Sequence, residues 1–342
     1  MNLAQLAEPR YRHPEDRWAL NLDDIRFIGK DLRRPECVLA TSSGDLFVAA
    51  LGHGIIHLTA DGRQYSIGNV GTVDGKDFIP NGLAFDSDGS FLVTNMGEGG
   101  GLWRLERSGA IKPVLREVDG QPLGATNFVL RDWQGRLWLT ISTRRWPISR
   151  AFNPLHGAIT ADGYLVLIDH RGARIVADNL AFANEVRIDR GGREVYVVET
   201  YARRISKFDV SVQGALSNRT SWTEFGHGTF PDGIAFDAEG HLWVASMTSN
   251  RLFRVAPDGE QTLLLEDNDP DYLVDIERRL EAGTLRREDV QNVPSKLLKN
   301  IASVTFGGAD LKTVYLGSLG GDSLAVLRSP VAGQPLPHWS VQ

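Results

Sequence analysis

The stretch FPDGIAFDAEGHLWVAS, residues 230–246, holds two short apolar segments on either side of a polar turn that contains Asp and Gly. Short alternating segments around such a turn predict a β-hairpin. A carboxylate, Asp232, stands at the start of the first segment, although an apolar hairpin does not need one there. The same pattern elsewhere in the chain accounts for its position.

Five other stretches repeat this order of a polar residue, a short apolar strand, a Gly or Asp turn and a second strand. They are RPECVLATSSGDLFVAA (34–50), IPNGLAFDSDGSFLVTN (79–95), ATNFVLRDWQGRLWLTI (125–141), FANEVRIDRGGREVYVVET (182–200) and IASVTFGGADLKTVYLGS (301–318). Most continue into a third strand, such as RLFRVAPDG after the first stretch. Six such units, each with a fourth and less regular strand implied, predict an all-β, six-bladed β-propeller.

The repeat also predicts the organisation of the chain. We expect one propeller domain over residues 1–342, with an N-terminal extension at 1–23, and with IRFIG (25–29) completing the last blade. Two longer intervals indicate insertions, at 143–162 within blade 3 and at 266–299 between blades 5 and 6. The second contains PDYLVDIERRLEAG, for which we expect a short helix that begins at a capping Asp271, turns Leu273, Ile276 and Leu280 inward and ends near Gly283.

Composition restricts the class of protein. Apolar residues make up 42% of the chain, so it can bury a substantial core, and the net charge of −6 disfavours nucleic acid and anionic membranes as partners. A single cysteine excludes an intramolecular disulfide. The start of the chain shows no secretion signal and no segment reaches the ~20 apolar residues of a membrane span. We therefore expect a soluble cytoplasmic protein with a small-molecule substrate; its oligomeric state is not predicted.

The polar starting residues predict a site on the propeller axis. They are Glu36, Asn81, Asn127, Asn184, Asp232 and Ser303. In a propeller the first strand of each blade lines the central channel, so these six side chains converge at one rim. Carboxylate and amide oxygens are ligands for a hard divalent cation, and Ca²⁺ accepts them in flexible geometry. No His or Cys belongs to the set, which disfavours a dedicated zinc or copper cage. By parity of the strands, both insertions overhang this rim and can shape a substrate pocket.

These pieces resemble the family of senescence marker protein, gluconolactonase and luciferin-regenerating enzyme, which also includes diisopropyl-fluorophosphatase. The resemblance runs from about residue 34 to residue 328 and rests on RPECV, TNFVLRDWQGRLW, FANEVRID with VYVVET, and PDGIAFDAEGHLWVA. It implies that Glu36, Asn184 and Asp232 bind the metal, and that Asn127 is a fourth ligand or a substrate-binding amide. Asn81 is expected to line the channel and contact substrate.

The family resemblance implies a metal-dependent hydrolase, and a lactonase in particular. The metal, Ca²⁺ or alternatively Zn²⁺, Mn²⁺ or Mg²⁺, would polarise the lactone carbonyl while Asp232 acts as base or nucleophile. One departure bears on substrate: sugar-lactone members often carry Arg where this chain has Ala125. Arg144, Arg145 and Trp146 in the first insertion are candidates to bind a carboxylate or aromatic group instead. The alternatives are a non-enzymatic binding propeller and a strictosidine-synthase-like lyase.

Overall fold

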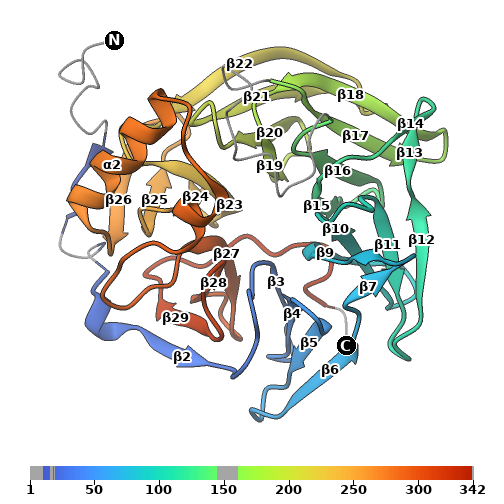
Figure 1. The fold of residues 1–342 in the computed structure, drawn as a ribbon, viewed down its shortest axis with the longest axis horizontal. Helices are drawn as coiled ribbons and strands as arrows, with labels where there is room; N and C mark the ends of the chain where they lie inside the picture. The colour runs from blue at the N-terminus through green and yellow to red at the C-terminus, as the bar shows by residue number, and fades with distance from the viewer. Residues whose placement is uncertain (1–10, 16–17, 19, 145–160, 341–342) are drawn as a thin grey trace.

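A computed structural model describes residues 11–15, 18, 20–144 and 161–340. Within this part of the chain, six antiparallel sheets surround a central axis (Figure 1), which confirms the six-bladed propeller. Blades 1 to 3 consist of β3 (Val38–Ala40), β4 (Leu46–Ala50), β5 (Gly54–Leu58) and β6 (Gln64–Gly68); β9 (Pro80–Phe85), β10 (Phe91–Asn95), β11 (Leu102–Leu105) and β12 (Ile111–Leu115); and β15 (Thr126–Arg131), β16 (Leu137–Ile141), β17 (Gly163–Asp169) and β18 (Gly172–Leu180).

Blades 4 to 6 follow the same order from the axis outward. They consist of β19 (Ala183–Ile188), β20 (Glu194–Glu199), β21 (Arg204–Val210) and β22 (Leu216–Glu224); β23 (Phe230–Phe236), β24 (Leu242–Met247), β25 (Arg251–Val255) and β26 (Gln261–Glu266); and β27 (Ile301–Gly307), β28 (Thr313–Ser318) and β29 (Leu324–Arg328). A short parallel strand, β1 (Tyr11–Arg12), extends blade 5. Two small hairpins lie outside the blades, β7 (Thr72–Val73) with β8 (Lys76–Asp77) and β13 (Glu117–Val118) with β14 (Gln121–Pro122).

The ring is closed by a strand from the beginning of the chain. The strand β2 (Arg26–Ile28) pairs antiparallel with β29, with Phe27 opposite Ala325, and supplies the fourth strand of blade 6. The prediction that residues 25–29 complete the last blade is therefore confirmed. A closed ring of sheets has no exposed inner edge, because the inner strand of each blade packs against those of its neighbours.

The repeated Asp-containing turn has a direct structural cause. In blade 5 the Asp237 carboxylate accepts hydrogen bonds from the backbone N–H groups of Glu239 (2.9 Å) and His241 (3.0 Å). It also accepts one from the Trp243 indole N–H at 3.1 Å and pairs with the Arg254 guanidinium at 2.8 Å. Asp132 makes the same turn and indole contacts in blade 3. One buried carboxylate thus fixes both the turn and the tryptophan that packs in the blade core.

The glycine after Asp232 is required by close approach at the axis. A Cβ on Gly233 would collide with the backbone of Ser303 in the adjacent inner strand β27. Gly82, which follows Asn81, is in the same position: a Cβ there would lie 2.6 Å from the Cα of Phe128. The inner strands are therefore close enough together that the polar residues before these glycines meet around the axis.

The insertion between blades 5 and 6 contains α2 (Pro270–Glu281) and α3 (Arg287–Gln291). The predicted helix is confirmed, and Leu273 and Ile276 are buried, whereas Leu280 is only partly buried. The predicted cap was wrong: the side chain of Asp269 accepts the hydrogen bond from the Tyr272 N–H at 3.0 Å. The helix begins two residues earlier than expected because Pro270, which lacks an N–H, is suited to its first turn.

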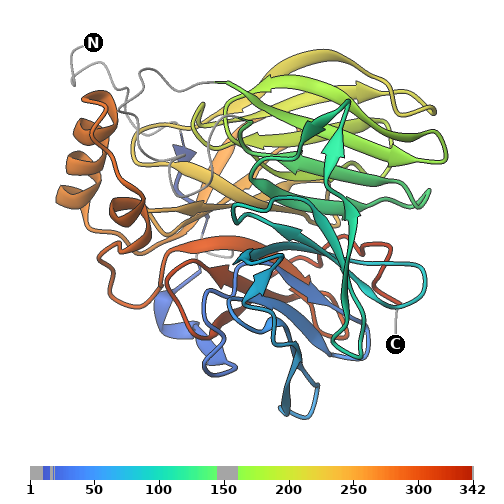
Figure 2. The ribbon, with the colours of Figure 1, turned by 45° about the vertical axis from the view of Figure 1, so that its right-hand side comes forward.

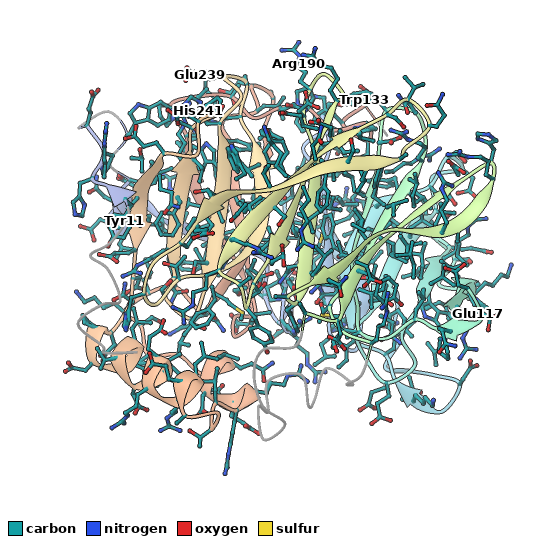
Figure 3. All side chains as sticks on the ribbon, turned by 90° about the horizontal axis from the view of Figure 1, so that it is seen from above. Tyr11, Glu117, Trp133, Arg190, Glu239 and His241 are labelled. Carbon is teal, nitrogen blue, oxygen red and sulfur yellow. The ribbon has the colours of Figure 1, made fainter. Side chains whose placement is uncertain are left out.

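The insertion lies at one face of the ring. Figure 2 shows α2 standing outside the stack of sheets, and Figure 3 places it on the side opposite the hairpin turns that carry Trp133, Arg190 and Glu239. No helix among the described residues is both long and apolar enough to span a membrane.

Candidate functional site

Four of the six polar starting residues line one cavity at the axis. They are Glu36, two residues before β3, Asn127 and Asn184, the second residues of β15 and β19, and Asp232, the third residue of β23. The cavity has a volume of about 30 Å³, which is enough for an ion or one to two water molecules. The described residues that line it are Arg34, Glu36, Met96, Asn127, Phe182, Asn184, Asp232, Met247, Arg287, Val290, Gln291 and Leu319.

Three buried oxygen atoms face this cavity; among the described residues two of them have no hydrogen-bond donor, and Glu36 Oε2 has only its ion pair with the Arg34 guanidinium. They are Glu36 Oε2, Asn184 Oδ1 and Asp232 Oδ1, on side chains that are 6%, 3% and 3% exposed. Buried oxygens without a donor are costly, and a cation is one group that satisfies several of them together. Two carboxylates and an amide oxygen form a donor set that suits a hard divalent ion. The residues present therefore fit the cation that the sequence predicts.

The orientation of Asn184 is fixed by its own hydrogen bond. Its amide Nδ2 donates to Thr200 Oγ1 at 3.1 Å, and Thr200 Oγ1 donates to the Pro231 carbonyl at 2.8 Å. Because the amide nitrogen is held in this way, the amide oxygen faces the cavity. Thr200 thus connects the starts of blades 4 and 5 and holds one candidate ligand in position.

Asn127 and Asn81 differ from the other candidates because their oxygen atoms already have donors. Asn127 Nδ2 donates to Ser142 Oγ at 3.1 Å, and Asn127 Oδ1 accepts a weak hydrogen bond from Asn81 Nδ2 at 3.3 Å. Asn81 Oδ1 in turn accepts from the Arg34 guanidinium at 2.9 Å. Asn81 is not part of the cavity lining, so it supports Asn127 and Arg34 from behind. Ser303 is also outside the lining, and its hydroxyl donates to the Glu36 carbonyl.

Arg34 was not predicted as a site residue, yet its guanidinium forms an ion pair with Glu36 inside the cavity. The backbone of Arg34 is left-handed, with φ of 60°, and so is that of Phe182 with φ of 63°. Such backbone conformations cost free energy in residues other than glycine and cluster at functional sites. Only the position of Arg34, two residues before Glu36, could have indicated its role from sequence.

Arg287 is the second unpredicted cation, and it comes from the insertion. It is the first residue of α3, and Val290 and Gln291 of the same helix also line the cavity. The sequence offered no signal for it, because the register of a five-residue helix in a long loop cannot be read from periodicity. The result is that α3 roofs the cavity formed by the starts of the blades.

Burial and like charge dominate the electrostatics of the cavity. Burial, and then the negative charges of Glu36 and Glu185, raise the pKa of Asp232 well above its usual value. Without a cation, the Asp232 carboxyl therefore resists ionisation. One layer deeper, burial raises the pKa of Glu185 to about 7, despite its ion pair with Arg187 at 2.8 Å.

Arg144, the one predicted substrate residue of the first insertion that the structure describes, is not part of the cavity lining. The Arg144 side chain is exposed and pairs with Asp178 at 3.0 Å, and its guanidinium lies 4.3 Å from the centre of the Tyr164 ring. Arg145 and Trp146 lie outside the described residues.

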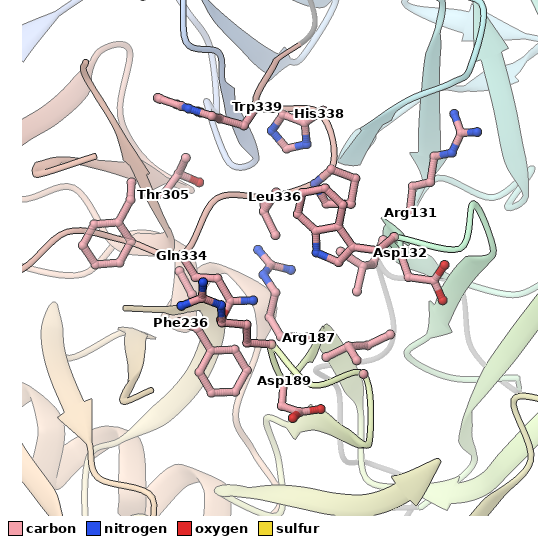
Figure 4. A pocket seen from close by; sticks show the side chains of 18 of the residues that line it. Arg131, Asp132, Arg187, Asp189, Phe236, Thr305, Gln334, Leu336, His338 and Trp339 are labelled. Atoms are coloured by element: carbon pink, nitrogen blue, oxygen red, sulfur yellow. The ribbon is translucent and has the colours of Figure 1, made fainter. Parts of the chain in front are cut away.

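A second cavity, of about 220 Å³, lies at the opposite mouth of the channel (Figure 4). The C-terminal segment with Gln334, Leu336 and His338 crosses it, and Arg187 reaches it from below. Its acidic residues already have hydrogen-bond partners: Asp132 accepts a hydrogen bond from the Arg136 guanidinium at 2.6 Å, and Asp189 accepts hydrogen bonds from backbone N–H groups of its own turn. Larger size alone therefore does not make this mouth the candidate metal site.

The chain is similar in sequence to a known protein family and to several characterised proteins. The family model described as the SMP-30/gluconolactonase/LRE-like region matches residues 30–266. Regucalcin of Danio rerio is 28% identical over 160 residues, which are 46% of this chain and 45% of that protein. A pentonolactonase of Haloferax volcanii is 26% identical over 179 residues, 52% of each chain. A strictosidine synthase-like protein of Arabidopsis thaliana is 28% identical over 185 residues, 51% of this chain and 46% of its own.

The chain thus spans about half the length of these curated relatives. Among solved structures, a luciferin-regenerating enzyme aligns with a TM-score of 0.69 at 18% identity and covers 93% of this chain and 99% of its own. This likeness shows the propeller fold.

Proposed function

The chain belongs to the SMP-30/gluconolactonase/LRE-like family, and on that premise we propose that it is a divalent-metal-dependent hydrolase that opens a small lactone. The observation that carries the proposal is the set of three buried oxygens, on Glu36, Asn184 and Asp232, that face one cavity, where Asn184 Oδ1 and Asp232 Oδ1 have no donor among the described residues and the Glu36 carboxylate has only Arg34. A propeller that only binds partners has no need of such a set on its axis. The pentonolactonase among the relatives supports a lactone as the substrate class.

The proposed metal ligands are Glu36, Asn184 and Asp232. Asn127 completes the set or binds substrate, although its oxygen already accepts a bond from Asn81. Ca²⁺ is the first choice because all the proposed ligand atoms are oxygens and none of the described residues that line the cavity is His or Cys. When bound, such an ion would polarise the lactone carbonyl and stabilise developing negative charge on its oxygen.

Asp232 is the proposed base or nucleophile. As a base, its carboxylate accepts a proton from the water that attacks the lactone carbonyl; the ring C–O bond then breaks and the ring oxygen leaves as an alcohol after protonation. Burial raises the pKa of this carboxyl toward the working range of a general base, and a nearby cation opposes that rise. The balance suits a lactone, because its carbonyl is more reactive than that of an amide.

The cavity volume adds a requirement for substrate entry. About 30 Å³ is less than a sugar lactone needs, so side chains that roof the cavity must move when substrate binds. The roof is α3, whose backbone is held by hydrogen bonds from Asn300 Nδ2 to the Val290 carbonyl (2.6 Å) and from the Tyr272 hydroxyl to the Asp289 carbonyl (2.5 Å). Side-chain motion of Arg287 and Gln291 is therefore the smallest change that admits a ligand.

The test is a pH-indicator assay of acid release from a panel of five- and six-membered lactones. The wild type, Asp232→Asn and Glu98→Gln are compared at equal concentration in excess Ca²⁺. Glu98 is an exposed carboxylate in the loop after β10 and serves as the charge-matched control. We expect Asp232→Asn to lose at least a hundredfold in kcat/KM and Glu98→Gln to match the wild type. Normal turnover by Asp232→Asn would disprove the mechanism, and a wild type that opens no lactone would disprove the function.

The lyase alternative is tested by the same variant. The lyase alternative gives no role to the three oxygen ligands, although a strictosidine synthase-like relative matches half of the chain. The hydrolase is favoured because these oxygen atoms are buried and face the same cavity, an arrangement that costs free energy unless they bind a cation.

A further inference from the structure

Two guanidinium groups face the same cavity as the two carboxylates. Arg34 is largely satisfied, because it pairs with Glu36 and donates to Asn81 Oδ1 at 2.9 Å. Arg287 differs: among the described residues its side chain has no hydrogen bond and no ion pair, although it is only partly exposed and lines the cavity. Burial, and then the neighbouring charge of Arg34, lower the pKa of Arg287. An arginine in this position is held at a cost in free energy.

The backbone that carries Arg287 is firmly anchored, so its position is not a matter of a loose surface loop. Val290, on the same short helix, is buried and its carbonyl accepts the hydrogen bond from Asn300. Asn300 also accepts a bond from the Thr248 N–H at 2.6 Å, which ties the insertion to blade 5. At the other end of the insertion, Glu277 is buried, pairs with Arg203 and accepts a bond from the Gly228 N–H at 2.6 Å.

The charges of the side chains that line the cavity determine which kind of substrate it favours. The charges of Glu36 and Asp232 are balanced by those of Arg34 and Arg287, so a divalent cation would leave the cavity with a net positive charge. A neutral lactone gains nothing from that excess, whereas a negatively charged group on the substrate does. Guanidinium is also the side chain that matches the paired oxygens of a carboxylate, phosphate or sulfonate.

Resting on the proposed lactonase function, we propose that Arg287, assisted by Arg34, binds an oxyanion group of the substrate and makes the enzyme selective for negatively charged lactones. Arg287 thereby takes the role that the sequence predicted for Arg144, Arg145 and Trp146, of which Arg144 is exposed and paired with Asp178. The specificity residue comes from the insertion between blades 5 and 6 and not from a blade strand.

The experiment compares three lactones on four proteins. D-glucaro-1,4-lactone carries a carboxylate, 6-phosphoglucono-1,5-lactone carries a phosphate, and D-glucono-1,5-lactone is neutral. The proteins are the wild type, Arg287→Ala, Arg287→Lys and the control Arg286→Ala, which removes an equal charge from the exposed neighbouring side chain. A second readout needs no turnover: calorimetry on chelated and on Ca²⁺-loaded protein measures the Kd of D-glucarate, a dianion, and of D-gluconate, a monoanion.

A charge-assisted hydrogen bond lost in Arg287→Ala should lower kcat/KM for the charged lactones about ten- to a hundredfold. We expect less than a threefold change for the neutral lactone, partial rescue by Arg287→Lys, and wild-type behaviour from Arg286→Ala. The Kd ratio of gluconate to glucarate should fall in Arg287→Ala. Carboxylate and phosphate arms show which oxyanion is preferred.

The outcomes separate this inference from the proposed function. If the wild type opens charged and neutral lactones equally, and Arg287→Ala matches Arg286→Ala in both rate and Kd, the inference is wrong while the lactonase stands. If the wild type opens no lactone, the proposed function fails, and the calorimetric Kd alone decides: Arg287-dependent glucarate binding supports an oxyanion site, and its absence overturns it.

Discussion

Occupation of the axial cavity by a divalent cation should raise the thermal stability of the folded chain. Because Glu36, Asn184 and Asp232 converge only in the native state, the cation binds the folded protein and not the unfolded one. At a free concentration of one hundred times its Kd, this linkage contributes about 2.7 kcal/mol. A chain of 342 residues unfolds with an entropy of about 0.7 kcal/mol per kelvin, so Tm should rise by roughly 4 °C.

Differential scanning fluorimetry or calorimetry measures this shift after exhaustive chelation and again in excess Ca²⁺. Glu36→Gln should lose most of the shift, because it removes one of the two charges that face the ion, and Asp232→Asn should do the same. Glu98→Gln, the exposed control, should keep the full shift. Equal Tm values for the wild type with and without Ca²⁺, Mn²⁺, Mg²⁺ or Zn²⁺ would refute the reasoning, as would a full shift in Glu36→Gln.

Three further predictions concern pH and stability. The folded-state pKa of Glu185 is about 7, which is above its unfolded value, so the folded chain holds a proton that the unfolded chain loses, and the free energy of unfolding falls as pH rises from about 4.5 to 7. Urea unfolding should show a fall of roughly 3 kcal/mol in the wild type relative to Glu185→Gln. Parallel pH profiles of the two proteins would contradict the assignment. Asp237→Ala leaves Trp243 and Arg254 without their buried acceptor, so urea unfolding should show a loss of about 3–5 kcal/mol; a loss below about 1 kcal/mol would contradict that role. Glu277→Ala should release α2 from Arg203 and Gly228, so limited proteolysis should cut within residues 267–299 much faster than in Glu281→Ala, an exposed control on the same helix; equal cleavage rates would show that Glu277 does not anchor the insertion.

The fold could be predicted from the sequence because a propeller repeats one local pattern. Each hairpin carries its own alternation of apolar residues and its own turn, and six copies at similar spacing leave few architectures to choose from. The ring closure by residues 25–29 followed from the missing fourth strand of the last blade. The helix cap was misplaced by two residues because Asp269 and Asp271 flank Pro270 and Asp271 was taken as the cap.

The site was only partly accessible from the sequence. The repeat position brought Glu36, Asn127, Asn184 and Asp232 to one cavity because strand starts share one place in every blade. Residues outside the repeat had no such guide. Arg34 turns into the cavity through a left-handed backbone just before a strand, and Arg287 comes from an insertion whose course depends on tertiary contacts with Asn300 and Arg203. Arg144 was predicted to bind substrate, but its guanidinium pairs with Asp178, and this pairing could not be predicted because Asp178 lies 34 residues away in the sequence.

The most direct test of the central claim is the initial rate of lactone opening by one protein sample in three states: as purified, after chelation and dialysis, and after return of one equivalent of Ca²⁺. We expect chelation to remove nearly all of the rate and one equivalent of Ca²⁺ per chain to restore it. A rate that survives chelation unchanged, while elemental analysis finds no divalent metal in the sample, would contradict the account.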